Sequence, residues 1–175
     1  MAEDREQTKF IVEPLSPRHD RANFSCGVEA LDTYLRRHAG QDLRKRVAVP
    51  FVLTNDGTTV AGYYTLSQFS VELDVVPEDV AKKLPKYPIV SATLLGRLAV
   101  ASAFRGQKLG EMLLMDALHR CWELSKQIAS AAVIVDAKDD AAASFYRRYG
   151  FLDLPKIARR LFLPMGTIDR LFKEG

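Results

Sequence analysis

Two apolar runs with a helical pattern between them constrain the fold more than any other feature of this chain. Thr93 to Val100 is too apolar for a strand that faces solvent, and Ala131 to Val135 is a second, near-continuous apolar run. Between them, after a short turn, apolar residues from Leu109 to Leu118 recur at helical spacing. Apolar strands of this kind are typical of sheets that are covered on both faces. The pattern therefore predicts an α/β domain built around a buried sheet.

Flanking segments supply the rest of that sheet. An Asp-Gly turn at 55–57 joins two β-rich runs, which is a strong hairpin signal. Strands alternating with helices around this antiparallel hairpin predict a mixed sheet. The further expected strands are 10–15, 49–53, 58–66, 151–152 and 160–163. Three further helices are expected: one from Val28 to Ala39, a short one that begins at Pro77, and one from Asp139 to Tyr149.

Length and composition exclude several classes of protein. The chain has 175 residues, which predicts a single domain over 1–175. No apolar run approaches the roughly 20 residues that a membrane span needs. The stretch Met1 to Lys9 is charged and polar, unlike a secretory signal. Two cysteines are too few for a disulfide framework and have no metal-binding spacing. We therefore expect a reduced, cytoplasmic protein with no membrane segment and no metal.

Basic residues gather in two places. The net charge is only +3, but residues 36–46 hold five basic residues against Asp42, and residues 147–160 hold five against Asp153. The rest of the chain has an excess of acidic residues. Such clusters attract polyanions through counterion release and electrostatic steering. Two solvated helix faces would give the same count, so the pattern alone leaves both interpretations open.

The turn between the first apolar run and its helix is a candidate phosphate site. It reads Phe-Arg-Gly-Gln-Lys-Leu-Gly over 104–110. A helix N-terminus offers unpaired amides, and glycines let a ligand approach the backbone. Arg105 and Lys108 would add positive charge. The turn matches neither nucleotide-hydrolase nor dinucleotide fingerprints, and an ordinary strand-to-helix turn remains the alternative.

Several of these segments together resemble the GNAT N-acetyltransferase superfamily. Its motif Arg/Gln-x-x-Gly-x-Gly/Ala is similar to the stretch from Arg105 to Gly110, with Lys108 where the central glycine is expected. A Phe-Tyr-x-x-x-Gly-Phe element follows at 145–151. The resemblance covers nearly the whole chain. It implies an α/β fold with a mixed, mostly antiparallel central sheet flanked by helices on both faces, and acetyl-CoA as co-substrate.

A narrower resemblance links the chain to the GNAT toxins of bacterial toxin–antitoxin modules. It rests on Phe24-x-Cys26-Gly27, on Leu31-Asp32-x-Tyr34-Leu35, on Gly62-Tyr63-Tyr64-Thr65-Leu66-Ser67, and on the closing Leu163-Pro164-Met165. These toxins acetylate the α-amine of aminoacyl-tRNA and so block translation. The resemblance also implies a ribbon-helix-helix antitoxin and a homodimer.

The resemblance implies a role for specific residues. Tyr146 is the expected proton donor to the departing thiolate, and the amide of Val100 or one close by would polarise the thioester carbonyl. A partly buried tyrosine with a hydrogen-bonded hydroxyl is the alternative for Tyr146. Phe145 and Tyr149 are expected to face the core while Tyr146 points elsewhere. The expected contacts to coenzyme A are Leu98, Ala99, Val100, Arg105, Gly106, Gln107, Lys108, Leu109, Gly110 and Phe145.

Basic residues are the expected contacts to tRNA. Arg97, unusual in a buried strand, either pairs with a carboxylate or lines the acceptor cleft. An acidic segment of an antitoxin would seek the same basic residues. The expected tRNA contacts are Arg36, Arg37, Arg44, Lys45, Arg46, Arg97, Arg147, Arg148, Lys156 and Arg159, with Arg160 beside them.

Other functions stay open at the level of sequence. One is acetylation of a small amine, a polyamine or a protein N-terminus; another is a non-catalytic module that binds nucleic acid or protein. The remaining candidates for chemistry are weaker. Cys26 and Cys121 are expected to be buried thiols, the three scattered histidines to serve packing or the surface, and Asp139 and Asp140 to cap a helix.

Overall fold

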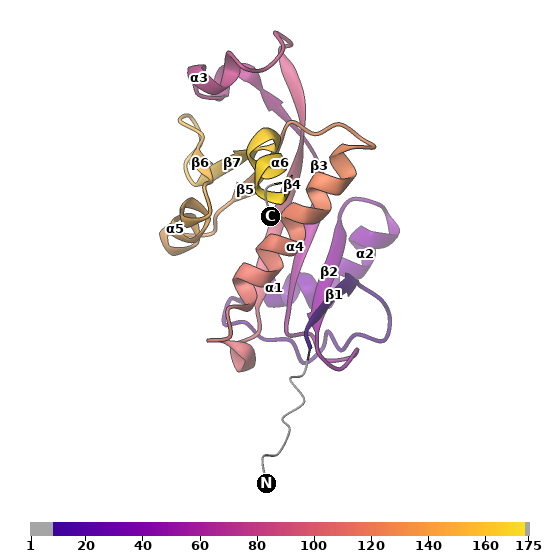
Figure 1. The fold of residues 1–175 in the computed structure, drawn as a ribbon. Coiled ribbons are helices and arrows are strands. Elements are labelled where there is room, and N and C mark those ends of the chain that lie inside the picture. The colour runs from indigo at the N-terminus through magenta and orange to yellow at the C-terminus, as the bar shows by residue number, and fades with distance from the viewer. Residues whose placement is uncertain (1–8, 174–175) are drawn as a thin grey trace. The chain divides into compact units, whose positions relative to one another are not determined.

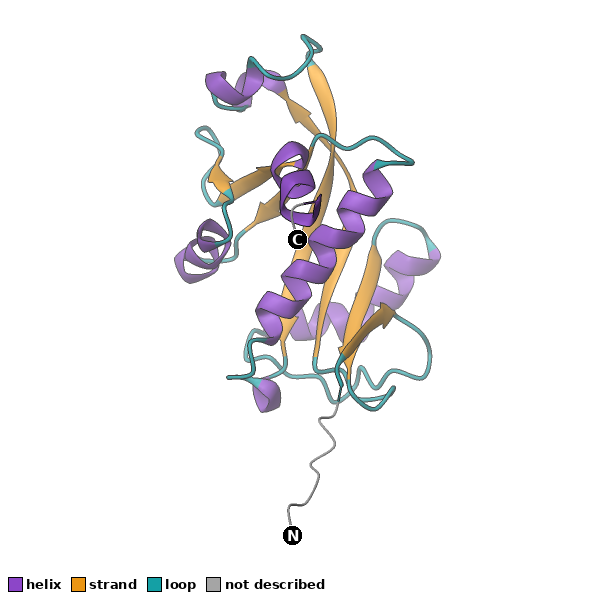
Figure 2. Cartoon of the chain, viewed as in Figure 1, coloured by secondary structure: helices purple, strands orange, loops and turns teal. Residues whose placement is uncertain are grey.

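A computed structural model describes residues 9–173, in which strands and helices alternate along the chain (Figures 1 and 2). The expectation about a secretory signal at the N-terminus falls mostly on residues 1–8 and lies outside the described residues. The strands are β1 (Ile11–Pro14), β2 (Val49–Thr54), β3 (Gly62–Glu72), β4 (Ile89–Val100), β5 (Ala132–Asp136), β6 (Leu152–Asp153) and β7 (Arg160–Pro164). The α-helices are α1 (Glu29–Thr33), α2 (Ala39–Arg44), α3 (Glu78–Ala81), α4 (Leu109–Ser125), α5 (Asp140–Arg148) and α6 (Met165–Lys173). Short helical turns of other types are η1 (Tyr34–His38), η2 (Leu73–Val75) and η3 (Ser102–Phe104).

The strands form one mixed sheet in the order β1-β2-β3-β4-β5-β7-β6. The pairs β1–β2, β5–β7 and β6–β7 are antiparallel, whereas β4 and β5 are parallel and α4 connects them. This confirms the predicted mixed, mostly antiparallel α/β sheet. No helix among residues 9–173 has both the length and the apolar character needed to cross a membrane.

The described chain divides into two compact units. Unit 1 comprises residues 9–64 and 98–113, and unit 2 comprises residues 65–97 and 114–173. The core of unit 1 is built on the helical stretch α1-η1-α2, where Tyr34, Leu35 and Ala39 are buried with Phe24 and Tyr63. The core of unit 2 joins Val71, Ala92, Ile134, Leu154 and Phe162 from five strand and loop segments. Each unit therefore has an apolar core of its own.

The predicted helix from Val28 to Ala39 is longer and less regular than expected. It continues through α2 to Arg44, and its middle turn η1 is a π-helix. Tyr34 opens that turn, stacks on Tyr63 with ring centroids 6.2 Å apart, and donates a hydrogen bond to Asp42 (2.9 Å). Single π-helical turns are rare and are frequently found at functional sites. Arg36 and Arg37 lie on this turn and are exposed, as the sequence predicted.

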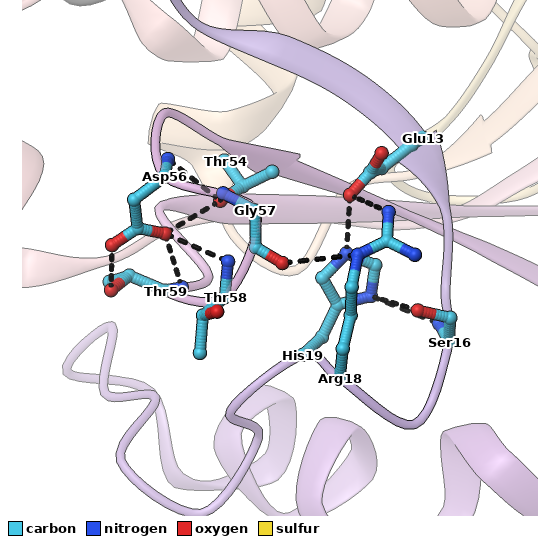
Figure 3. A network of polar contacts seen from close by, with 9 residues as sticks. All are labelled: Glu13, Ser16, Arg18, His19, Thr54, Asp56, Gly57, Thr58 and Thr59. Carbon is cyan, nitrogen blue, oxygen red and sulfur yellow. Dashed lines mark hydrogen bonds and ion pairs between the residues drawn. The ribbon is translucent and has the colours of Figure 1, made fainter.

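The predicted hairpin turn is a longer connection. Residues 58–61, expected to be strand, precede β3, because Asp56 captures the backbone there (Figure 3). Its carboxylate accepts hydrogen bonds from the amides of Thr58 (2.8 Å) and Thr59 (2.7 Å) and from the hydroxyls of Thr54 and Thr59. These bonds hold the pKa of Asp56 well below its usual range, with the Thr59 hydroxyl contributing most. A single carboxylate thus organises the turn.

A second polar group fastens the loop after β1 (Figure 3). Buried His19 accepts a hydrogen bond from the amide of Ser16 at Nδ1 (2.9 Å), so Nε2 carries the proton toward Glu13 (2.7 Å). Arg18 forms an ion pair with the same carboxylate and donates to the carbonyl of Gly57 (3.2 Å). His19 therefore has a structural role, as the sequence suggested.

The sequence missed α6 altogether. This helix contacts β7, buries Ile168, and stacks Phe172 on Trp122 with ring centroids 5.4 Å apart. The indole N–H of Trp122 donates to Asp169 (2.8 Å). The other differences are of extent: β3 runs on to Glu72, and β4 begins at Ile89 rather than Thr93.

Candidate active site

The turn that leads into α4 presents free backbone amides. Within residues 9–173, the amides of Gly106, Gln107 and Lys108 donate no hydrogen bond, whereas that of Arg105 bonds to the Ser102 carbonyl (3.4 Å). A Cβ placed on Gly106, whose φ is +84°, would meet nothing within 4 Å. Leu109 and Gly110 then begin α4, whose first amides lack helical partners. The turn is open and can receive an anion at the start of a 17-residue helix.

Lys108 has a backbone conformation that glycine adopts readily. Its φ is +57°, in the left-handed region that residues with a Cβ rarely occupy. In the described residues only Arg46 and Arg159 share this feature among non-glycine residues. The lysine at the position of the motif's central glycine therefore keeps a glycine-like φ and adds an exposed ammonium group.

Arg105 holds the turn in place from one side. Its guanidinium donates to the carbonyl of Cys26 (2.6 Å), in the loop before α1. A Cβ on Gly27, whose φ is +83°, would lie 2.9 Å from that guanidinium. In the Cys26-Gly27 pair of the narrower resemblance, Cys26 thus accepts a hydrogen bond from Arg105 and Gly27 leaves room for its guanidinium. The side chain that the sequence assigned to phosphate has a protein partner of its own.

The end of β4 lies beyond its pairing with β5. The parallel register joins Thr93, Leu94 and Leu95 to residues 133–135, and Leu98–Val100 follow after it. On these last residues the opposite edge is crowded, since a Cβ on Gly62 would lie 2.8 Å from the Ala99 carbonyl. The backbone of Leu98–Val100 therefore lies outside this register, and its edge away from Gly62 can pair with an extended ligand.

Tyr146 has a buried ring and an unengaged hydroxyl. The residue is 7% exposed and packs against Phe145 and Phe151, with ring centroids 5.3 and 5.4 Å away. Its hydroxyl makes no hydrogen bond within the described residues. Every side-chain polar atom that is fully buried in these residues does have a hydrogen-bond partner. The hydroxyl must therefore reach the surface. Burial raises the pKa of Tyr146 above its ordinary value, so the group stays protonated and can donate.

The predicted orientation of α5 was wrong. Phe145 and Tyr149 are half-buried, whereas Tyr146 and Ala143 are the residues that face the core. The helix is turned so that the i, i+3 pair Ala143 and Tyr146 packs inward, and Phe151 closes on Tyr146 after Gly150 reverses the chain. Asp139 accepts from the amide of Ala142 (2.8 Å), which confirms its capping role.

The first basic cluster, defined as Arg36, Arg37, Arg44, Lys45 and Arg46, is exposed and unneutralised. Within the described part of the chain none of these side chains forms an ion pair. Arg36 donates to the Phe24 carbonyl, and Asp42 is occupied by the Tyr34 hydroxyl. The cluster therefore keeps its full positive charge.

The second basic cluster, Arg147, Arg148, Lys156, Arg159 and Arg160, is largely neutralised. Arg147 pairs with Asp153 (2.9 Å), Arg159 with Asp140 (3.1 Å), Arg160 with Asp136 (2.7 Å) and Lys156 with Asp74 (3.9 Å). Arg160 also lies over the ring of Phe69, 5.0 Å from its centroid, and Arg148 lies 5.8 Å from that of Phe145. The local charge counted from sequence overstates the field of this cluster.

The remaining candidates are structural or half-buried. Cys26 and Cys121 are buried thiols that form no disulfide within the described residues, and burial raises the pKa of Cys121 to about 12. Residues 9–173 contain no group of three or more His, Cys, Asp or Glu that could hold a metal ion. Arg97 is half-buried on β4 and is not without a partner.

Sequence reasoning missed one basic residue. Arg21, outside the runs counted above, brings its guanidinium to Gly40 in α2. No local motif marks it, because the loop after β1 separates it in sequence from the cluster that it joins.

Comparison with known proteins places the chain in a family. The family model of the acetyltransferase (GNAT) domain matches residues 48–152. The chain is 33% identical to "Probable toxin TacT" of Sinorhizobium fredii over 93% of its length and 95% of that protein. It is 35% identical to a "tRNA-acetylating toxin" of Mycobacterium tuberculosis over 86% of its length and 89% of that protein.

Solved structures agree with this assignment. A mutant of KacT superposes with a TM-score of 0.87 at 31% identity, over 93% of this chain and 99% of that one. AtaT complexed with acetyl-methionyl-tRNAfMet gives a TM-score of 0.87 at 29% identity, over 94% and 99%. The amide-lined turn, the open end of β4 and these matches lead to one conclusion: the chain belongs to the GNAT acetyltransferase family.

Proposed function

We propose that this protein is a toxin that transfers the acetyl group of acetyl-CoA to the α-amino group of aminoacyl-tRNA and so blocks translation. Two of its relatives are named as a tRNA-acetylating toxin and a probable toxin, and AtaT has been solved with acetyl-methionyl-tRNAfMet. The observation that carries the choice of acceptor is the first basic cluster, whose five exposed cations have no carboxylate partners in the described chain. A small amine as acceptor would need no such surface.

The residues of unit 1 fit coenzyme A. The free amides of Gly106, Gln107 and Lys108 and the start of α4 suit a pyrophosphate. The backbone of Leu98–Val100 suits an extended arm, and the amide of Val100 is our candidate to polarise the thioester carbonyl. A structure of AtaTR with AcCoA supports the choice of co-substrate. Residues 98–100, residues 105–110 and Phe145 remain proposed contacts.

Tyr146 is the proposed proton donor. An aminoacyl α-amine, with an ordinary pKa of about 7.7–8.0, is partly neutral near pH 7.5 and needs no strong base. Its nitrogen forms the new bond to the acetyl carbon while the carbon–sulfur bond breaks. The hydroxyl of Tyr146, whose pKa burial raises, is protonated near pH 7.5 and donates its proton to the departing thiolate, while water takes the proton that the nitrogen loses. Tyrosine-to-phenylalanine mutants of AtaT and KacT have been solved.

Partners follow from the same relatives. AtaT has been solved with the C-terminus of the antitoxin AtaR, and KacTA with DNA. We propose that a cognate antitoxin of ribbon-helix-helix type neutralises this protein. We also propose that the toxin is a homodimer, that it acts in the cytoplasm, and that residues 1–175 form a single acetyltransferase domain. The second basic cluster stays in the proposal as a tRNA contact of lesser weight, because most of its charges form ion pairs. Arg97 stays with it, since it is half-buried and not without a partner.

Labelled acetyl-CoA tests the proposal. The protein is incubated with charged bulk tRNA, with deacylated tRNA, and with a panel of amines. We expect label on charged tRNA only. Label on amines alone would make the protein a small-amine acetyltransferase, and no label anywhere would leave a binding module.

A tyrosine variant tests the mechanism. Tyr146→Phe should lower kcat at least tenfold and leave the Kd for coenzyme A within about twofold, since general acid catalysis contributes about 10²–10⁴. Tyr149→Phe, on the same helix, is the matched control and should keep the wild-type rate. An unchanged kcat in Tyr146→Phe would remove this residue from the chemistry.

A further inference from the structure

Two guanidinium groups converge on Gly40. At the point where a Cβ would stand on this residue, Arg21 brings its Nη1 to 2.9 Å and Arg44 brings its Nη1 to 3.4 Å. Arg21 comes from the loop after β1, and Arg44 from the last residue of α2. All three residues belong to unit 1. Two like charges are thus held near one point from two different segments.

Nothing in the described chain neutralises this pair. Neither Arg21 nor Arg44 forms a side-chain hydrogen bond or ion pair within residues 9–173. Asp20, next to Arg21 in sequence, accepts hydrogen bonds from Asn23, and Asp42, two residues before Arg44, accepts one from Tyr34. Like charges brought together without a counter-ion repel each other. An anion bound between them would relieve this repulsion and accept hydrogen bonds from both groups.

Glycine at position 40 is what leaves the space. It lies inside a helical stretch, where alanine is ordinarily more favourable. Its φ is not in the left-handed region, so the backbone does not require glycine. A methyl group there would lie against Arg21, which would have to move. Glycine at this position therefore lowers helix stability, and it leaves room for the guanidinium groups of Arg21 and Arg44.

We propose that Arg21 and Arg44, above Gly40, form a clamp for one phosphate of the tRNA backbone. The inference rests on the proposed function and adds to it Arg21 and Gly40, which the charge pattern had not singled out. Guanidinium groups suit phosphate because their planar N–H donors match its oxygens.

The surroundings favour a nucleic acid over an acidic peptide. The clamp continues into the rest of the first basic cluster, with Arg36 and Arg37 on η1 and Lys45 and Arg46 after Arg44. Together these residues form a run of cations that an evenly charged backbone can follow. The α1-η1-α2 stretch turns apolar residues inward, to the unit 1 core. Between residues 34 and 46 no apolar side chain is exposed, and the exposed Val47 and Val49 come only after Arg46. The cluster itself therefore offers mainly charge.

Three variants test the clamp. Gly40→Ala keeps every charge and fills the space, and Arg21→Gln removes one guanidinium. Arg18→Gln is the matched control, since Arg18 lies in the same loop but is held by Glu13 and the Gly57 carbonyl. Binding of deacylated bulk tRNA to the full chain is measured by fluorescence anisotropy over a series of KCl concentrations. Thermal unfolding is recorded for each variant.

The expected results differ between the variants. Arg21→Gln should weaken binding about tenfold near 0.15 M salt and reduce the slope of log K against log[KCl] by about 1, as for one lost phosphate contact. Gly40→Ala should weaken binding in the same direction while unfolding no earlier than wild type. Arg18→Gln should leave the slope unchanged. A decline for Gly40→Ala at unchanged stability separates the clamp from a folding defect.

Two results would overturn the clamp without touching the proposed function. One is Arg21→Gln behaving like Arg18→Gln in tRNA binding while wild type still acetylates charged tRNA. The other is unchanged tRNA binding with weakened binding of an acidic antitoxin peptide, which would assign the arginines to the antitoxin. Failure of wild type to label charged tRNA, despite salt-dependent binding, would instead refute the proposed function alone.

Discussion

The strained backbone at Lys108 allows charge and geometry to be separated at the proposed pyrophosphate turn. Lys108→Gly removes the ammonium group but suits the observed φ of +57°. Lys108→Val removes the same charge and places a β-branched side chain where it is least tolerated. The two variants therefore differ mainly in how well they hold the three free amides of residues 106–108.

The magnitudes follow from the conformation and the exposure. A left-handed conformation destabilises the folded state by about 1–2 kcal/mol when the residue has a Cβ. Glycine avoids this cost but loses more conformational entropy on folding, which offsets about 0.5–1 kcal/mol of the gain. Lys108→Gly should therefore be slightly stabilising, by up to about 1 kcal/mol, or about 2–4 °C in Tm for a chain of this length. Lys108→Val should unfold earlier than wild type.

Binding of coenzyme A then distinguishes the causes. An exposed ion pair contributes about 0.2–1 kcal/mol, so loss of the ammonium group should weaken binding about fivefold at most. A misplaced amide forfeits a charge-assisted hydrogen bond of about 1.5–3 kcal/mol, which is roughly ten- to hundredfold. Isothermal titration with coenzyme A measures both variants. Equal weakening in Lys108→Gly and Lys108→Val would refute the view that the backbone of this turn holds the phosphates.

Two further predictions concern stability. Arg46 occupies the left-handed position after α2, where the amides of Arg46 and Val47 bond to the carbonyls of Leu43 and Asp42, a Schellman arrangement that ordinarily ends in glycine. Arg46→Gly should raise Tm and weaken tRNA binding together; a lower Tm would contradict this. Asp56→Asn should destabilise the protein near neutral pH, and the difference from wild type in urea unfolding should shrink as pH falls below about 4, because a lowered pKa gives stability that is lost on acidification; a constant difference would contradict it.

Local chemistry explains which parts of the fold were predictable. The run that became β5 is buried from Val133 to Val135, and β4 alternates buried Leu95 and Ala99 with half-buried neighbours, as apolar runs in a sheet do. Asp139 caps α5 through its own side chain, which is adjacent in sequence to the helix. The start of β3 was misplaced because Asp56 competes with the strand ladder for backbone amides, an effect that β-propensity does not include. Helix α6 was missed because its formation depends on Trp122, which is far away in sequence.

At the candidate site, identity was more predictable than orientation. The motif located Tyr146, but helical spacing alone placed Phe145 and Tyr149 inside, because Phe151 and Gly150, which seat Tyr146 in the core, act from beyond the helix. Lys108 could not be judged from sequence either. Whether a lysine can replace glycine depends on its φ, and only the structure shows that it tolerates +57°.

The two basic clusters show where counting charges fails. Both hold five cations and one aspartate in sequence, yet strand register sets Asp136 opposite Arg160, and α5 begins with Asp140 next to Arg159. Those carboxylates lie outside the window that was counted, and they reduce the field that a polyanion would meet. The first cluster ends at Arg46, whose backbone is left-handed, and folding brings Arg21 to it from another segment. Folding therefore adds a cation to the first cluster, whereas ion pairs neutralise most of the second. A phosphate-rich partner should therefore respond to substitutions on η1 and α2 more than to substitutions on α5 and β7.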